Sequence, residues 1–130
     1  MVKKAEYQFG TGRRKSSKAQ VRVFKGTGKL INTKKPTNVF SEKELSYIME
    51  PLKLLGLEKK YDVSYIVSGG GTSSQLDSIR LGLSRAVSKT SEEASKTLKK
   101  ENLLSRDPRE KERKKPGLKR ARKAPQWAKR

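Results

Sequence analysis

The sequence predicts an α+β fold, with an antiparallel-rich sheet in one layer and helices in the other, followed by an extended basic C-terminal tail. Stretches with alternating apolar residues and stretches with apolar residues at helical spacing follow one another in the order βββαβαα. By contrast, residues 106–130 have no such period and contain 12 basic and three acidic residues. We therefore expect a globular domain over residues 1–104 and a tail over residues 105–130.

Three short strands are expected first. The segment AEYQFG (5–10) places Ala5, Tyr7 and Phe9 on one side of a strand, and KAQVRVFKG (18–26) alternates again. The residues of this second strand that we expect to face inward are Ala19, Val21 and Val23. Gly26-Thr27-Gly28 is typical of a turn, and the third strand is KLIN (29–32).

The first helix is expected to begin at Ser41, which forms a capping box with Glu44 ahead of apolar residues at helical spacing. Pro51 should end this helix near Met49 or Glu50, because the residue before a proline disfavours the helical conformation.

The segment YDVSYIVS (61–68) is rich in β-branched and aromatic residues, and it predicts a central strand. Three glycines lead from it to a helix over about 74–88 that Ser74 and Asp77 could cap. Arg80, Ser84 and Arg85 are expected on its outer side. The residues expected to be buried are Leu76, Ile79, Leu83, Ala86 and Val87. Thr90 with Glu93 predicts a last helix that ends near residue 101.

Charge narrows the class of partner. The chain has 33 Lys and Arg against 13 Asp and Glu, a formal net charge of +20. Residues 106–130 contribute +9 of this, so the expected domain is basic as well. Such a protein associates with polyanions, and nucleic acid is a better candidate than an anionic membrane, because no segment resembles a membrane span or a basic amphipathic helix. The start, MVKKAEYQFG, has no apolar segment, so we expect no signal peptide.

Cys and His are absent from the chain. This excludes disulfides, thiolate or imidazole metal sites, thiol nucleophiles and the commonest general base. Lys, Ser and carboxylates could still catalyse a reaction, but we expect a protein that is not an enzyme, with no metal and no cofactor.

The segment GTGRRKSS (10–17) resembles a phosphate-binding loop, because glycines precede Lys15-Ser16. A P-loop, however, needs Gly directly before that pair and a helix after it, whereas Arg14 precedes it here and a strand follows. We favour a hairpin loop whose cations contact backbone phosphates. A solvated cationic loop is the plainer alternative.

The segment SGGGTSS (68–74) also permits two interpretations. Its glycines could let a phosphate approach the N–H groups at a helix N-terminus. A tight strand-to-helix connection that requires positive φ is the more favoured interpretation, and the two are compatible.

The last residues, LLSRDPREKERKKPGLKRARKAPQWAKR, are basic but not of low complexity. Two of the prolines, a Gly, a Leu and the chain's one Trp occupy single positions among the charges beyond residue 113. Too few large apolar residues are present for this segment to fold alone. The single Pro, Gly, Leu and Trp residues among its charges suit an extended segment that follows a defined groove of nucleic acid.

These three segments resemble those of bacterial small-subunit ribosomal protein nine, and the resemblance covers nearly the whole chain. That family usually has Gly, Ala, Gly and His where this chain has Ser74, Leu76, Asp77 and Leu81, and it usually ends with Phe and Ser where this chain has Trp127 and Ala128. The resemblance implies the fold of the second domain of ribosomal protein five, with a left-handed βαβ crossover. It also implies a structural constituent of the small ribosomal subunit that is cytoplasmic and part of the ribosome.

The partners implied are 16S rRNA in the head of the small subunit, neighbouring head proteins and the peptidyl-site tRNA. Lys129 and Arg130 are the residues implied near the backbone of the tRNA anticodon stem-loop. The residues expected at rRNA are Arg13, Arg14, Lys15, Lys18, Arg22, Gly69, Gly70, Gly71, Arg80, Arg106, Arg109, Arg113, Lys114, Lys115, Lys119, Arg120, Arg122, Lys123 and Gln126. Two other hypotheses remain: a free nucleic-acid chaperone or DNA-compacting protein, and a phosphate-loop enzyme.

Overall fold

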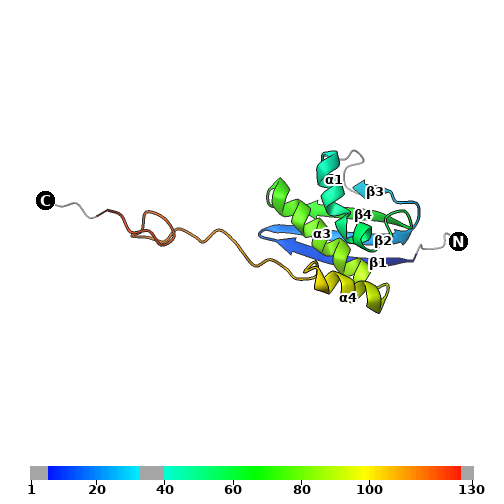
Figure 1. The fold of residues 1–130 in the computed structure, drawn as a ribbon. Coiled ribbons are helices and arrows are strands. Elements are labelled where there is room, and N and C mark those ends of the chain that lie inside the picture. The colour runs from blue at the N-terminus through cyan, green and yellow to red at the C-terminus, as the bar shows by residue number, and fades with distance from the viewer. Residues whose placement is uncertain (1–5, 33–39, 127–130) are drawn as a thin grey trace.

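Four strands form one mixed sheet in the computed structural model, which describes residues 6–32 and 40–126 (Figure 1). The strands are β1 (Tyr7–Arg14), β2 (Ser17–Lys25), β3 (Leu30–Asn32) and β4 (Tyr61–Ser68), in the spatial order β1-β2-β4-β3. The β1–β2 and β2–β4 pairs are antiparallel, and β3–β4 is parallel. The predicted α+β class and the interior position of β4 are therefore confirmed.

The first hairpin differs from the prediction. β1 continues to Arg14, which pairs with Ser17, so only Lys15 and Ser16 form the turn. Lys15 adopts a positive φ of 52°. The expectation of a loop over residues 10–17 is wrong, because the glycines there serve packing inside a strand, as described below.

The two hairpin strands differ in which of their side chains are buried. Ala19, Val21 and Val23 are buried, as predicted. Tyr7 and Phe9 are exposed, and the covered positions of β1 are Gly10 and Gly12. The side of β1 that the large residues occupy is therefore the solvent side.

The first helix is α1 (Glu42–Ile48), and the predicted capping box between Ser41 and Glu44 is present. It ends at the predicted place, but a second short helix, α2 (Glu50–Leu54), follows at once. Pro51 lies in the first turn of α2, where its missing N–H costs no intrahelical hydrogen bond. α2 was not predicted, because a proline after a helix usually indicates its end and here it also begins the next helix.

The long helix is α3 (Thr72–Ser88), which begins two residues earlier than expected and has Gly71, not Ser74, at its N-cap. Of the residues expected to be buried, Leu76 is only partly covered. Ser84 was expected to face outward but is buried, and its hydroxyl donates a hydrogen bond to the carbonyl of Arg80 at 2.8 Å. The residues buried as predicted are Ile79, Leu83, Ala86 and Val87.

The last helix, α4 (Glu92–Lys100), is capped by Ser91, whose hydroxyl accepts the N–H of Ala94 at 3.1 Å. The predicted capping residue, Thr90, instead donates its hydroxyl to the carbonyl of Val87. The predicted N-cap was one residue too early, because the hydroxyls of Thr90 and Ser91 are both suited to cap the charged helix that follows.

Close contact between α3 and β1 explains the glycines of the first hairpin. A Cβ on Gly12 would lie 1.7 Å from the carbonyl oxygen of Ser78, and one on Gly10 would lie 2.1 Å from that of Gly82. Gly82 itself faces Val21, whose Cγ2 would be 2.8 Å from an added Cβ. The Gly-Thr-Gly segment therefore lets helix and strand backbones approach directly.

The core lies between the sheet and the helices. Tyr65 of β4, Ile48 of α1, Leu52 of α2 and Leu98 of α4 are fully buried and belong to one apolar cluster. Because β3 and β4 are parallel, α1 and α2 lie within a crossover between neighbouring strands. The left-handed sense of that crossover stays a prediction.

Beyond α4 the described chain contains no further helix or strand, and Figure 1 shows it running away from the sheet. A small loop is closed by Lys119, whose N–H donates to the carbonyl of Lys123 at 2.8 Å. Glu112, which precedes this loop, pairs with both Lys115 and Arg122. The division into a domain over 1–104 and a tail over 105–130 stays a prediction.

Candidate nucleic-acid interface

Cations gather at the free end of the β1–β2 hairpin. Arg13 and Lys18 are opposite one another in the ladder, and Lys15 lies in the turn between them. All three are exposed and form no ion pair with another described residue. Arg22 is exposed on the same side of β2 as Lys18, because side chains alternate along a strand. The structure therefore brings four of the predicted rRNA residues together on one surface.

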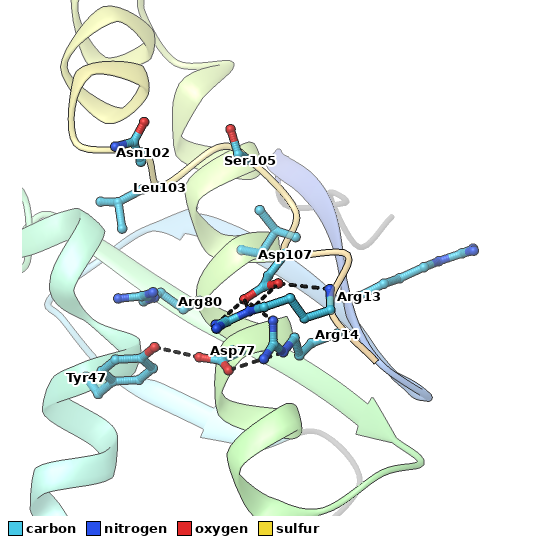
Figure 2. A pocket seen from close by; sticks show the side chains of 11 residues that line it. Arg13, Arg14, Tyr47, Asp77, Arg80, Asn102, Leu103, Ser105 and Asp107 are labelled. Atoms are coloured by element: carbon cyan, nitrogen blue, oxygen red, sulfur yellow. Dashed lines mark hydrogen bonds and ion pairs between the residues drawn. The ribbon is translucent and has the colours of Figure 1, made fainter. Parts of the chain in front are cut away.

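Arg14, the next residue along β1, points to the other side. It forms ion pairs with Asp107, at the start of the tail, and with Asp77 of α3, the latter at 3.8 Å. Its side chain is only 13% exposed. Figure 2 shows Arg14 between the two carboxylates, while Arg13 is directed away from them. Arg14 thus has protein partners where the sequence analysis expected phosphates.

These residues line a pocket of about 230 Å³ beside the middle of α3 (Figure 2). Asp107 also accepts hydrogen bonds from the backbone and the guanidinium of Arg109, at 2.9 Å for the backbone N–H and 2.7 Å for Nη2. The side chain of Arg109, its backbone N–H and the guanidinium of Arg14 hold the pKa of Asp107 well below its usual range. The pocket therefore contains two carboxylates, which already pair with Arg14 and Arg109.

Tyr47 of α1 extends this network. Its hydroxyl donates to Asp77 at 2.5 Å, and burial together with that hydrogen bond raises the pKa of Tyr47 to about 12. Arg80 lies over the Tyr47 ring, with Cζ 4.2 Å from the centroid, and pairs with Glu50 at 2.7 Å. Arg80, like Arg14, is held by the protein, although its side chain remains 27% exposed.

The network formed by Arg14, Asp77 and Asp107 was not found by sequence reasoning. The available signal was the segment RDPR (106–109), in which an acidic residue stands among basic ones. Nothing in the sequence showed that this acid would meet a residue more than 90 positions earlier. We call these three residues the tail anchor, because they join the first tail residues to β1 and α3.

The glycine segment after β4 is a tight connection. Gly69 and Gly70 have positive φ values of 78° and 66°. A Cβ on Gly69 would lie 2.6 Å from the carbonyl of Ser16, so the segment also packs on the hairpin turn. Gly71 has ordinary φ and open space around it. The favoured interpretation, a connection that needs positive φ, is confirmed for Gly69 and Gly70.

The tail presents its cations to solvent. The exposed basic residues of the tail in the described range that were predicted at rRNA are Arg106, Arg109, Arg113, Lys114, Lys115, Lys119, Arg120, Arg122 and Lys123. Gln126 is exposed as well. Among them, Arg109, Lys115 and Arg122 pair with tail carboxylates. Lys129 and Arg130, predicted at tRNA, lie outside the described residues.

Within the described ranges, no cluster of three or more acidic side chains is placed to hold a metal ion. In the same ranges, none of the helices combines the length and apolar character that a membrane crossing requires. What the surface offers chemically is a spread of guanidinium and ammonium groups on a hairpin and a thread. Such groups position a polyanion by its phosphates and do not read its sequence.

Comparison with known proteins agrees with this chemistry. Residues 12–130 match the family described as ribosomal protein S9/S16. Small ribosomal subunit protein uS9 of Trichormus variabilis is 50% identical to the chain, over 94% of this chain and 91% of that protein. Small ribosomal subunit protein uS9c of Pyropia yezoensis is 47% identical, over 100% and 97%. The uS9 protein of Acaryochloris marina is 49% identical, over 93% and 90%.

Proposed function

The chain belongs to the ribosomal protein S9/S16 family, and from that membership we propose that it is a structural constituent of the small ribosomal subunit that binds 16S rRNA in the head. Proteins of this family are structural and not catalytic. The observation that best supports rRNA binding is the group of exposed, unpaired cations on the β1–β2 hairpin, in a chain of net charge +20.

The cations of the chain divide into two groups in this proposal. Arg13, Lys15, Lys18 and Arg22 contact phosphates directly, together with the tail cations and the N–H groups near Gly69–Gly71. Arg14 and Arg80 act instead through the fold, since both are bound to carboxylates. Direct contacts release counterions from RNA, whereas internal ion pairs do not.

Arg13→Ala tests this division against its neighbour, Arg14→Ala. Loss of a direct phosphate contact at Arg13 should flatten the dependence of log affinity on log salt by about 0.7–0.9. Arg14→Ala should leave that slope unchanged and lower the free energy of unfolding instead. Binding of each full-length variant to 16S rRNA over a series of salt concentrations gives the slopes. Equal slopes for Arg13→Ala and the unsubstituted chain would mean that Arg13 is only solvated and contacts no phosphate.

We further propose that the tip of the tail, Lys129-Arg130, contacts the peptidyl-site tRNA. The uncharged spacer APQWA (124–128) separates these cations from the Lys119–Lys123 cluster. An extended chain advances about 3.3 Å per residue, so the tip reaches more than about 10 Å beyond the cluster. A separate cationic point suits a separate anionic target, and phosphate contacts suit a site that accepts every tRNA.

Deletion of residues 129–130 tests the tip. It should leave rRNA binding and subunit assembly intact, and weaken tRNA binding by about 1 kcal/mol, the scale of one hydrogen bond. The measurement is the dissociation of peptidyl-site tRNA from purified small subunits that contain the truncated protein. Impaired assembly with undiminished tRNA affinity would assign the tip to rRNA.

A further inference from the structure

The sheet has one face that no described helix covers. α3 contacts β1, β2 and β4 on the opposite face, and α1, α2 and α4 all contact α3. Figure 1 shows α3 lying across the sheet with the other helices on the same side. We call the uncovered side the open face. Strand pairing places one set of side chains on it, because residues directly opposite in an antiparallel ladder share a face.

The open face is unusually rich in large apolar side chains for a surface. Four of the five large hydrophobic residues that are exposed in the described chain belong to it. They are Tyr7 (43% exposed), Phe9 (37%), Ile31 (46%) and Ile66 (38%). Phe24 lies opposite Tyr7 and is partly exposed. Tyr7, Phe9 and Phe24 are neighbours in the ladder, whereas Ile31 and Ile66 lie on β3 and β4, with polar residues of β2 and β4 between. A cluster of exposed aromatic residues on a sheet indicates a surface that meets a partner.

The aromatic residues at one end of this face are already arranged with a cation. The rings of Tyr7 and Phe24 have centroids 5.4 Å apart at an interplanar angle of 51°. The Arg22 guanidinium lies over the Tyr7 ring, with Cζ 5.1 Å from its centroid. Arg22 is in turn opposite Phe9 in the ladder. A flat group of a partner molecule that packs against this cluster would contact aromatic rings and a positive charge at the same time.

The charge of the open face favours one kind of partner. Arg13, Lys18 and Arg22 lie on it. Asp62, an acidic residue on the same face, accepts hydrogen bonds from three backbone N–H groups of residues 27–29 at 2.8–2.9 Å. These hydrogen bonds lower the pKa of Asp62, the one from Lys29 most. A second copy of the chain would bring like charges together, so a polyanion with flat apolar groups fits best.

We propose that the open face is an RNA-binding surface, on which unpaired bases stack against Tyr7, Phe9 and Phe24 while Arg22 and Lys18 contact the adjacent phosphates. Base–aromatic stacking tolerates any base, because every base has a π-face. Sheets with exposed aromatic residues use the same physics to hold unpaired RNA. The inference rests on the proposed rRNA-binding function and adds to it a surface distinct from the tail.

The first test uses the full-length chain and a fluorescein-labelled octaadenylate RNA. The double variant Tyr7→Val, Phe9→Val removes two stacking rings and keeps β-branched residues that suit a strand. It should bind the RNA about fivefold more weakly or worse, the equivalent of at least one lost stack. Leu54→Val is the matched control, since Leu54 is 46% exposed on α2, away from the sheet, and should bind as the unsubstituted chain does.

The second test identifies the occupant inside the small subunit. Phe9 is replaced by the photoreactive p-benzoylphenylalanine, and purified subunits that contain this chain are irradiated. Capture of rRNA supports the proposal. Capture of another ribosomal protein, or octaadenylate affinity unchanged in the double variant, overturns it. Either failure leaves the salt slopes of the hairpin variants as they are, so the failure of this inference is distinguishable from the failure of rRNA binding itself.

Discussion

Arg13 and Arg14 are neighbours in the sequence and have different surroundings in the fold. Successive side chains of a strand point to opposite faces, so Arg13 reaches solvent while Arg14 turns toward Asp77 and Asp107. From composition alone, both arginines would be expected to bind phosphates. Because side chains alternate along the strand, Arg13 is available to a partner, whereas Arg14 forms ion pairs within the fold.

The tail anchor sets where the tail leaves the domain, and Asp107 is its acidic member within the tail. Asp107→Asn should weaken the ion pairs with Arg14 and Arg109. The fraction of molecules in which residues 105–109 are detached from the sheet and α3 should then increase about two- to fivefold, on the scale of a partly exposed ion pair. Heteronuclear amide relaxation of these residues at pH 6 should therefore show increased motion on the fast timescale. Glu110→Gln, which removes a nearby carboxylate with no ion pair to a described residue, should leave the relaxation unchanged.

The same anchor predicts a dependence on pH. The folded-state pKa of Asp107 is lowered, chiefly by the Arg109 side chain, so its contribution is present above the ordinary value of 3.8 and is lost as pH falls below it. The unsubstituted chain should thus acquire the relaxation of Asp107→Asn only in strong acid. Identical relaxation of variant and unsubstituted chain at pH 6 would mean that Asp107 holds nothing in place.

At the scale of elements, α3 organises the molecule through its contact with β1. The three glycines at this contact bring the backbones together, and α3 also secures the outer strand of the sheet. Lys89 donates to the carbonyl of Phe9 at 2.6 Å, and Arg85 donates to that of Thr11 at 2.8 Å. These cations occupy acceptors of an edge strand that could otherwise pair with another chain.

Gly12→Ala should destabilise the fold, because its Cβ would overlap the backbone of Ser78 and force α3 away from the sheet. Overpacking of this kind costs about 1–3 kcal/mol, and a backbone neighbour that cannot rotate aside places the expected loss at the upper end. Gly71→Ser is the matched control, since that position has open space and Ser is a good N-cap. Urea unfolding measures both. An unaltered midpoint in Gly12→Ala would show that the contact is loose.

Elements with one clear local signal were predictable. Alternation in β2 and the capping box of α1 depend on neighbouring residues alone, and both are confirmed. The side of β1 was not predictable, because its covered positions are glycines and its large residues face solvent. A pattern based on apolar side chains cannot recognise a packing surface made of backbone.

The candidate site shows the same limit. The exposed cations of the hairpin and tail follow from composition, and the family followed from the motifs that contain them. The pairing of Arg14 with Asp107 did not follow, because it joins residues far apart in the sequence through the tertiary fold. Which cations are free is a property of the folded chain, whereas how many there are is a property of the sequence.

At the scale of the whole molecule, the chain combines a basic globular part with a basic thread attached to it by the tail anchor. A sheet and helices fix the hairpin cations in one place, and the thread extends the reach of the molecule beyond them (Figure 1). Free, the chain would repel itself and bind polyanions without selection. Incorporated in a ribonucleoprotein, the same charges neutralise phosphates that must approach one another.

The central claim is that this chain is a component of the small ribosomal subunit and not a free nucleic-acid-binding protein. Its most direct test is sedimentation of a tagged chain from cell extract through a sucrose gradient at high salt, which weakens nonspecific phosphate contacts. The account predicts that the chain sediments with the small subunit, in a constant ratio to its rRNA. A chain that remains at the top of the gradient, or spreads over all nucleic acid at low salt and leaves it at high salt, would contradict the account.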